Sequence, residues 1–322
     1  MKTYTVPHTN LKAARIAYGC GSMGGTWDQT PSTDAHRATA VKALRATLDA
    51  GVNFFDHADI YCYGKSETVF AAAIKELGAK REQLILQSKT GICFKGDTAP
   101  EAVARYDFNY DHIIASAEGS LKRLGTEYLD ILLLHRPDVL VEPEEVARAF
   151  DVLQKSGKVR NFGVSNHNVF QLELLRKYVK QPFVGNQLQF SLLHTGLVDA
   201  GISVNQAKPS VGCEGILDYC RLHNIQIQAW SPMANGRVTG VWTDGKPADE
   251  LARVVAEFAA KRNVPADAIA LAWILRHPAG ILPIIGSLKP ERIAAASKAD
   301  GVELSHGDWY RLYQAARGQS VP

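Results

Sequence analysis

The sequence predicts an α/β fold, a single (β/α)8 barrel of the TIM type with an N-terminal β-hairpin and extra C-terminal helices. Three observations favour this fold. Strand-like apolar runs alternate strictly with segments of helical periodicity along the chain. There are eight such units, and eight parallel strands close a barrel. Three of the runs end abruptly in a polar residue, and barrel enzymes carry their chemistry at such strand ends.

Each element has its own signal in the sequence. Two short alternating pieces within 3–14 predict the hairpin. Runs of β-branched, leucine and aromatic residues predict strands at 15–18, 52–56, 84–89, 129–135, 159–164, 184–190, 225–230 and 281–285. Apolar spacing of three or four residues, mostly closed by glycine, predicts helices at 36–50, 66–77, 113–124, 146–153, 170–178, 216–223, 249–262 and 266–277, with a last pair starting near 290 and 305.

Composition limits the class of protein. The chain has 322 residues, a formal charge of +3, 46% hydrophobic and 21% charged residues, which is typical of a globular protein. Barrels commonly run this long and no segment is linker-like, so we expect one domain over 1–322. The balanced charge gives no reason to expect nucleic acid or a membrane surface as partner. No apolar run is long enough to cross a bilayer, and the N-terminus lacks the apolar core of a signal peptide.

The cysteines predict neither a metal site nor a disulfide framework. There are five, at scattered positions and without a CxxC pair: Cys20, Cys62, Cys93, Cys213 and Cys220. A reducing cytoplasm suits this pattern best.

Residues 19–24 match the GxGxxG dinucleotide fingerprint letter for letter. That fingerprint requires a helix to open directly on the glycines. Here the chain continues as loop through Pro31, and helical spacing begins only near His36. We therefore reject a Rossmann interpretation and expect a loop at a strand end.

Four polar residues define a candidate site. Asp56, Lys89 and His135 end three predicted strands, and Tyr61 follows the first of them within one loop. Taken singly, each has an ordinary interpretation: a loop cap, a solvated lysine, a hydrogen-bonded core histidine and a packing aromatic. If the strands are parallel and adjacent, all four side chains meet at one mouth of the barrel.

Together these groups suit proton transfer from a phenol. Tyrosine has a pKa of roughly 10, which a nearby ammonium lowers. Lys89 can supply that ammonium, Asp56 can hold Lys89 in an ion pair, and His135 as a neutral imidazole can orient a carbonyl oxygen. The set would protonate a carbonyl as it receives a hydride, and the hydride must come from a cofactor because no side chain supplies one.

The same residues resemble the three signature segments of the aldo-keto reductases: Asp56-x-Ala58-x-x-Tyr61, Ser88-Lys89 and Leu132-Leu133-Leu134-His135-Arg136-Pro137. The resemblance covers nearly the whole chain and is strongest toward the YdhF-like bacterial branch of that family. It implies reversible NADPH-dependent reduction of small aldehydes or ketones. Tyr61 would be the general acid, Lys89 and Asp56 its support, and His135 the residue that orients the carbonyl.

The resemblance also implies a cofactor site. Ser165 and Asn166 would bind the nicotinamide amide together with Gln187, and Trp230 would stack on the nicotinamide ring. A phosphate-binding loop would run over 283–292. The implied cofactor residues are Ser22, Met23, Asp56, Ser165, Asn166, Gln187, Trp230, Ser231, Pro232, Asn235, Gly236, Arg237, Gly286, Ser287, Lys289 and Arg292.

The choice of NADPH has some support from the residues themselves. A helix N-terminus over 287–291 binds phosphate well. Lys289 and Arg292 add positive charge that suits a 2′-phosphate, although the ordinary interpretation of these two residues is a solvated helix start. Ala295 and Ala296 stand where many family members carry a Glu-Asn pair that contacts adenine.

Substrate choice is expected to depend on the loops at this face. Candidate pocket walls are Trp27, Cys62, Tyr63, Phe94 and His194, the last on a long loop over 194–214. Two other functions remain open. Lys89 could form a Schiff base, as in aldolases. The chain could also be a non-enzymatic NADPH-binding regulator, like the potassium-channel β-subunits that share the fold.

Overall fold

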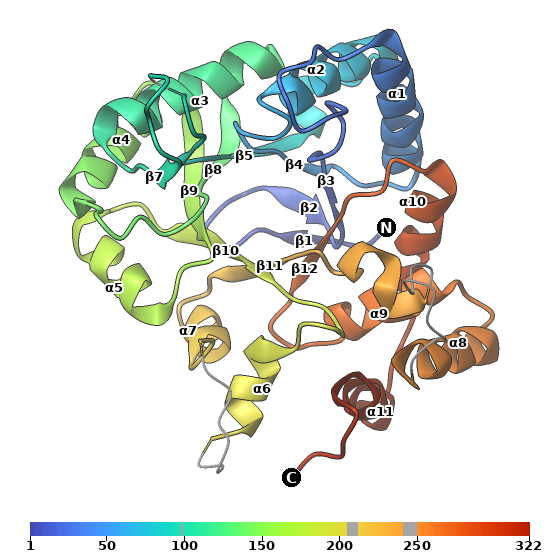
Figure 1. The fold of residues 1–322 in the computed structure, drawn as a ribbon. Coiled ribbons are helices and arrows are strands. Elements are labelled where there is room, and N and C mark those ends of the chain that lie inside the picture. Colours follow the sequence, from blue (N-terminus) through green and yellow to red (C-terminus); the bar gives the residue numbers. More distant parts are fainter. Residues whose placement is uncertain (98, 205–211, 241–249) are drawn as a thin grey trace.

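The computed structural model describes residues 1–97, 99–204, 212–240 and 250–322. Eight parallel strands form a closed barrel surrounded by helices (Figure 1). Neighbouring strands follow one another in chain order, and the barrel closes where β12 pairs with β3. The barrel strands are β3 (Ala17–Gly19), β4 (Phe54–Asp56), β5 (Ile85–Thr90), β8 (Leu129–Leu134), β9 (Val159–Ser165), β10 (Phe183–Gln189), β11 (Gln226–Trp230) and β12 (Leu282–Ile285). The predicted barrel is confirmed.

The helices lie between the strands as the alternation predicts. They are α1 (Asp34–Asp49), α2 (Lys65–Leu77), α3 (Tyr110–Leu124), α4 (Pro143–Lys155), α5 (Val169–Tyr178), α6 (Gly196–Ile202), α7 (Ile216–Leu222), α8 (Glu250–Arg262), α9 (Ala266–Leu275), α10 (Pro290–Ser297) and α11 (His306–Arg317). Short 3₁₀ turns are η1 (Arg81–Gln83), η2 (Ala234–Thr239) and η3 (Lys298–Gly301). No helix in the described ranges combines the length and the hydropathy needed to cross a membrane.

The predicted hairpin closes the N-terminal end of the barrel. It consists of β1 (Thr3–Thr5) and β2 (Lys12–Ala14), which pair antiparallel. Val6 and Ala13 pack against strand residues inside the barrel. The Tyr4 hydroxyl donates to Gln226 at the start of β11, with 2.8 Å between the oxygens. Access to the barrel interior is therefore from the C-terminal ends of the strands.

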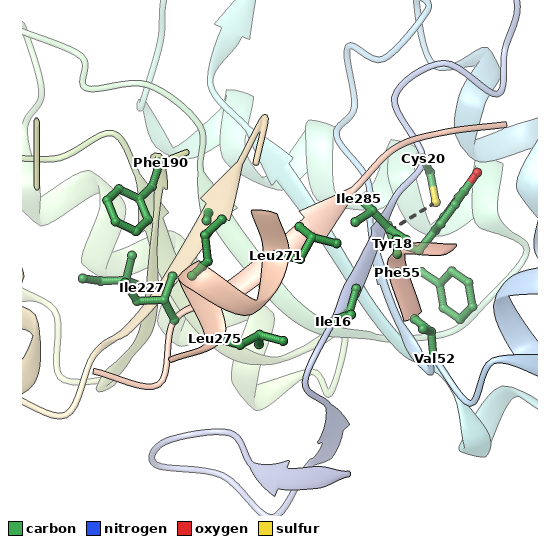
Figure 2. Packing of buried hydrophobic residues seen from close by; sticks show 14 of the residues in the cluster. Ile16, Tyr18, Cys20, Val52, Phe55, Phe190, Ile227, Leu271, Leu275 and Ile285 are labelled. Carbon is green, nitrogen blue, oxygen red and sulfur yellow. Dashed lines mark hydrogen bonds between the residues drawn. The ribbon is translucent and has the colours of Figure 1, made fainter. Parts of the chain in front are cut away.

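Alternating side chains divide the core into two layers. Phe54 belongs to the cluster inside the barrel, and Phe55 to the larger cluster between the barrel and its helices. Figure 2 shows part of the outer layer, where Ile16, Tyr18 and Phe55 pack beside Ile285. Period-two alternation on a strand buried from both sides produces this arrangement.

Helix α5 buries a different face from the one its sequence suggests. The apolar spacing that predicts this helix is that of Phe170, Leu174 and Tyr178, but the first two side chains are 84% and 45% exposed. Leu172 and Leu175 are buried instead. Apolar residues occupy both faces of this short helix, so periodicity alone did not identify the buried one.

Two features outside the barrel were not predicted. The expected loop over 194–214 contains helix α6, and its residues 205–211 lie outside the described part of the chain. A small antiparallel ribbon follows β5, made of β6 (Ile92–Cys93) and β7 (Arg105–Tyr106). Strands of two residues are too short to show alternation, so no sequence signal identifies them.

Candidate active site

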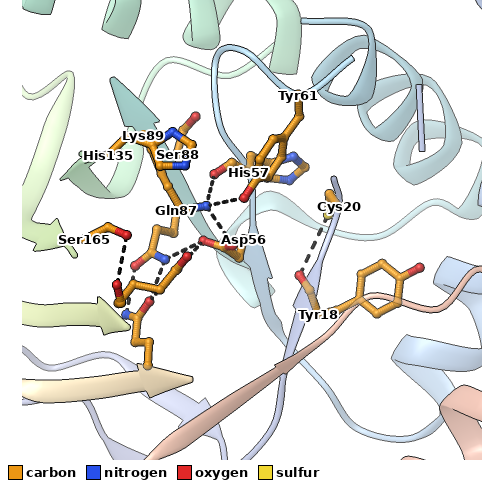
Figure 3. A network of polar contacts seen from close by, with 12 residues as sticks. Tyr18, Cys20, Asp56, His57, Tyr61, Gln87, Ser88, Lys89, His135 and Ser165 are labelled. Carbon is orange, nitrogen blue, oxygen red and sulfur yellow. Dashed lines mark hydrogen bonds and ion pairs between the residues drawn. The ribbon is translucent and has the colours of Figure 1, made fainter. Parts of the chain in front are cut away.

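The four predicted polar residues meet at the C-terminal mouth of the barrel. Lys89 is the centre of the cluster (Figure 3). Its Nζ donates to Asp56 Oδ2 at 2.8 Å, to the His57 carbonyl oxygen at 2.7 Å and to the Tyr61 hydroxyl at 2.9 Å. These three bonds use all three ammonium protons, so the nitrogen is held in one place.

The loop after β4 is built to hold Tyr61 over Lys89. The His57 amide donates to the Gln87 carbonyl oxygen and the Asp59 amide to that of Lys89, so β5 ties the loop down. Immediately after Tyr61 the backbone enters the left-handed region, with φ of 49° at Cys62 and 58° at Tyr63. Non-glycine residues adopt this conformation only when the surroundings enforce it, commonly at functional sites.

Burial and charge together set the protonation states of Lys89 and Tyr61. Lys89 is fully buried, which favours the neutral amine, but Asp56 and Tyr61 outweigh burial and raise the pKa of Lys89. Burial also raises the pKa of Tyr61, and Lys89 lowers it by less. The expectation that Lys89 brings the phenol below its usual pKa is therefore wrong for this state of the protein, because burial dominates. Tyr61 is a protonated phenol beside an ammonium.

His135 is a neutral imidazole, as expected. Burial, followed by the charges of Lys89 and Arg136, holds the pKa of His135 well below its usual value. The ring lies edge-on to Tyr61, with 6.0 Å between ring centroids. His135 Nδ1 is buried and has no hydrogen-bond partner within the described residues. Both rings line the same cavity, so they can reach one carbonyl oxygen together.

A layer of buried glutamines lies beneath Asp56. Gln87 and Gln187 each donate from Nε2 to Asp56 Oδ1, at 2.6 Å and 3.0 Å, and both also donate to Gln228 Oε1. Sequence reasoning missed Gln87 and Gln228, although a polar residue within an apolar strand was a usable signal. Gln187 lines the cavity as expected, while its amide nitrogen is engaged by Asp56 and Gln228.

Four predicted cofactor residues form a group connected by hydrogen bonds: Ser165, Asn166, Gln187 and Trp230. Asn166, with a φ of 61°, accepts from Trp230 Nε1 at 3.1 Å and donates to the His135 carbonyl oxygen at 3.2 Å. Ser165 Oγ donates to the Gln187 carbonyl oxygen. The Trp230 ring is therefore held at one wall of the cavity by a hydrogen bond at its edge.

An elongated cleft runs from this group toward α10. It consists of two adjoining cavities of about 270 and 410 Å³ that share Ser22, Ser231, Ile284 and Gly286. Predicted residues that line the cleft are Ser22, Asp56, Tyr61, His135, Ser165, Asn166, Gln187, Trp230, Ser231, Pro232, Asn235, Gly236, Gly286, Ser287 and Arg292. Met23 is buried elsewhere, and Arg237 and Lys289 are exposed and do not line these cavities.

The outer cavity has strained backbone on one side and a helix start on the other. Ser231, Ala234 and Asn235 have φ of 51°, 44° and 57°. Arg292 lies in the first turn of α10, 3.6 Å from the Asp267 carboxylate. Asp267 also lines this cavity, and no sequence signal pointed to it because it lies on the preceding helix.

The predicted substrate walls fall into three groups. Trp27 is 54% exposed and edge-on to Tyr61, with centroids 6.1 Å apart, and Tyr63 stacks on Phe94 at 4.3 Å. Cys62 is turned into the neighbouring loop, where its thiol bonds the carbonyl oxygens of Gly21 and Gly25. His194 is exposed in a turn bridged to Ser191.

Arg136 is a further charged residue of the cleft that was not predicted. Arg136 follows His135 directly, lines the inner cavity and lies over the Trp230 ring at 5.7 Å. It belongs to a signature segment of the sequence, but no chemical argument from the sequence had given it a role.

Buried histidines make the stability of the fold depend on pH. Burial lowers the pKa of His57 to about 3 and of His167 to about 4, and His135 is lowered as well. All three would take up protons near pH 6.5 once unfolded, so stability is complete above that pH and is lost below it. Asp59 has the opposite effect on stability. Burial raises its pKa to about 7, so the folded protein binds a proton there that the unfolded chain does not, and stability rises as the pH falls below 7.

We therefore expect the free energy of unfolding in urea to be at least about 2 kcal/mol lower at pH 5.5 than at pH 7.5, because burial also lowers the pKa of His277 and His112 and adds to the loss. The variant Asp59→Asn lacks the opposing group, so its difference should be about 2 kcal/mol larger than that of the wild type. Equal free energies of unfolding at the two pH values would contradict the buried neutral histidines.

Comparisons with known proteins show which family the chain resembles over nearly its whole length. Residues 15–317 match the model of the Aldo/keto reductase family. The uncharacterised oxidoreductase YcsN of Bacillus subtilis is 37% identical over 97% of both chains. The oxidoreductase YdhF of Escherichia coli is 38% identical over 88% of this chain and 89% of its own.

A solved structure gives the same fold. An aldo/keto reductase from Klebsiella pneumoniae, in complex with NADP and acetate, superposes with a TM-score of 0.73 at 26% identity, over 100% of this chain and 97% of the other. NADP(H) is the cofactor of the family. With the barrel, the lysine-centred cluster and the cleft already described, these matches lead to one conclusion: the chain belongs to the aldo-keto reductase family of oxidoreductases.

Proposed function

We propose that the protein reduces small aldehydes or ketones to alcohols with NADPH, and that Tyr61 is the general acid. One observation supports this most strongly. The Tyr61 hydroxyl lies 2.9 Å from the buried Lys89 ammonium, on the wall of a cleft that also contains His135. A protonated phenol beside a fixed cation can release its proton to a developing alkoxide without a change in structure.

The cleft fits a dinucleotide. At its inner end, Trp230 offers a ring face, and Ser165 and Asn166 offer polar groups. At its outer end, Ser287 and Arg292 lie at the start of α10, where the N-terminus of the helix and the positive charge suit a phosphate. When bound, the cofactor supplies the hydride that no side chain can. The complex of the Klebsiella relative with NADP supports this assignment.

Each residue of the cluster has its own role in the proton transfer. Tyr61 and His135 hydrogen-bond the carbonyl oxygen and fix its position between them. Tyr61 gives its proton to that oxygen, and the Lys89 ammonium at 2.9 Å stabilises the phenolate that remains. Asp56 keeps Lys89 charged and in place through the 2.8 Å ion pair. In the reverse direction the phenolate takes the proton back.

A Schiff base at Lys89 is disfavoured by the same contacts. An amine must be neutral to attack a carbonyl, whereas Asp56 and Tyr61 hold Lys89 as an ammonium whose three protons are all donated. Borohydride with a carbonyl substrate should therefore leave Lys89 unmodified.

The reductase function can be distinguished from a regulatory one by two measurements on the same protein. We expect saturable quenching of tryptophan fluorescence by NADPH, and oxidation of NADPH that depends on added aldehydes or ketones. Tight NADPH binding with no turnover across a broad carbonyl panel would favour the non-enzymatic regulator. Five free thiols suit a reducing compartment, and we propose that the enzyme acts in the cytoplasm.

Arg292 provides a test of the preference for NADPH. If it binds the 2′-phosphate, Arg292→Gln removes a charge-assisted hydrogen bond of about 1.5–3 kcal/mol and raises the KM for NADPH by about tenfold or more. The KM for NADH should not change. Lys298→Gln removes a charge from the far end of α10 and serves as the control. An equal effect on both cofactors would place Arg292 outside the 2′-phosphate site.

A further inference from the structure

A second cluster of polar side chains lies outside the cleft, at the base of the β6–β7 ribbon. Cys93 ends β6, Asp107 follows β7, and His112 lies in the first turn of α3. Their ligand atoms all lie within 4.8 Å of one another. Cys93 Sγ is 3.8 Å from both ring nitrogens of His112. The reaction proposed above uses none of these residues.

We propose that Cys93, Asp107 and His112 bind one Zn²⁺ ion, with water as the fourth ligand. Thiolate, imidazole and carboxylate are the ligands that zinc takes in proteins. Zinc bonds of about 2.3 Å to sulfur and about 2.0 Å to nitrogen place those two atoms about 3.5 Å apart in a tetrahedron. The observed 3.8 Å is close to that distance, and a rotation of the His112 ring would turn one nitrogen toward the sulfur, which now lies equally far from both.

The backbone holds the three ligands in place before any ion arrives. The ribbon pairs Cys93 with Arg105, and the Asp107 amide donates to the Gly91 carbonyl oxygen at 3.0 Å. Asn109 caps α3 by accepting from the His112 amide at 2.8 Å. A site whose ligands are already ordered loses little entropy on binding.

Outer contacts also suit a cation. Asp97 and Asp107 bring two negative charges against the single positive charge of Arg105, which lies 2.9 Å from Asp97 and 3.5 Å from Asp107. Asn109 also donates from its backbone amide to Asp107 Oδ1 at 3.1 Å. Such outer hydrogen bonds orient metal ligands and are a usual part of zinc sites.

Metal binding would replace the S–H bond of Cys93 by a sulfur–zinc bond and release that proton to solvent, with no oxidation or reduction. The absence of a CxxC pair hid this cluster in the sequence, because its members are separated by 14 and five positions and meet only through the ribbon.

The site has a consequence for the cleft, which rests on the proposed function. Phe94 follows Cys93 directly and stacks on Tyr63, two residues beyond the proposed acid. An ion that ties the ribbon to α3 would fix Phe94 against Tyr63, on the loop of the proposed acid, and leave the proton-transfer groups untouched. Zinc should therefore lower the KM for the carbonyl and leave kcat unchanged.

Cobalt substitution tests the site without any assay of activity. Chelator-treated protein titrated with Co²⁺ should gain a thiolate-to-cobalt charge-transfer band in the near ultraviolet, complete at one ion per chain and removed by one equivalent of Zn²⁺. Cys93→Ser and His112→Gln should abolish stoichiometric binding, while Cys213→Ser, which removes a half-buried thiol elsewhere, should retain it. The wild-type spectrum is informative even if a variant fails to fold.

A wild-type protein that shows no charge-transfer band would overturn the zinc site, as would a band that persists in Cys93→Ser. A KM for the carbonyl that is the same with and without zinc would overturn the link to Phe94. Because binding is read from cobalt alone, failure of the proposed reductase function would leave the result on the site unaffected.

Discussion

The variant Tyr61→Phe should reduce carbonyls about 10²–10⁴ times more slowly than the wild type, because it lacks the proposed acid that protonates the product oxygen. Only the hydroxyl is lost. Lys89 keeps its bonds to Asp56 and to the His57 carbonyl oxygen, so the fold and the affinity for NADPH should be unchanged. Steady-state kcat and an equilibrium titration with NADPH measure the two quantities.

Tyr63→Phe is the matched control for this variant. Tyr63 lies two positions away on the same loop, is 41% exposed and stacks on Phe94, so loss of its hydroxyl should leave kcat near the wild-type value. If Tyr61→Phe and the wild type turned over at the same rate, the acid would have to be sought at His135 or Lys89.

Lys89→Met should impair both catalysis and stability. The Asp56 carboxylate would remain buried without its ion-pair partner, which typically costs about 3–5 kcal/mol. Tyr61 would lose the cation that stabilises its phenolate, so kcat should fall by about 10² or more. Urea unfolding and steady-state kinetics measure the two losses.

A double substitution separates these two effects. Asp56→Asn combined with Lys89→Met removes the uncompensated charge, so most of the lost stability should return while activity stays low. If the double variant were as unstable as Lys89→Met alone, the stability of this part of the barrel would not depend on the ion pair.

Much of the fold could be predicted from the sequence because long-range geometry follows from local pattern in a parallel barrel. Strands buried on both sides read as apolar runs, and helices with one buried face read as periodic stripes. Gly78 and Gly125, both left-handed, end α2 and α3 as expected. The apolar spacing did not identify the buried face of α5, because Phe170 and Leu174 form an equally apolar stripe on its exposed side.

The candidate site could be predicted only where residues follow strand ends. Asp56, Lys89 and His135 carry that signal, and the structure brings them together with Tyr61. Groups that reach the site from elsewhere carried no such signal. Asp267 comes from a helix that reads as core in the sequence.

The sequence also could not show whether burial or the Lys89 charge has the larger effect on the pKa of Tyr61. The sequence argument gave the effect of the Lys89 charge on Tyr61 with the correct sign, but it could not weigh that effect against burial, which depends on the packed structure.

The central claim is that this chain transfers hydride from NADPH to a carbonyl. The most direct measurement uses NADPH deuterated at the transferred position and mass analysis of the product. We predict an alcohol that carries one deuterium on its carbinol carbon, formed in equal amount to the NADPH consumed. Saturable NADPH binding with no labelled alcohol from any carbonyl of a broad panel would contradict the account and favour a regulatory, non-catalytic role.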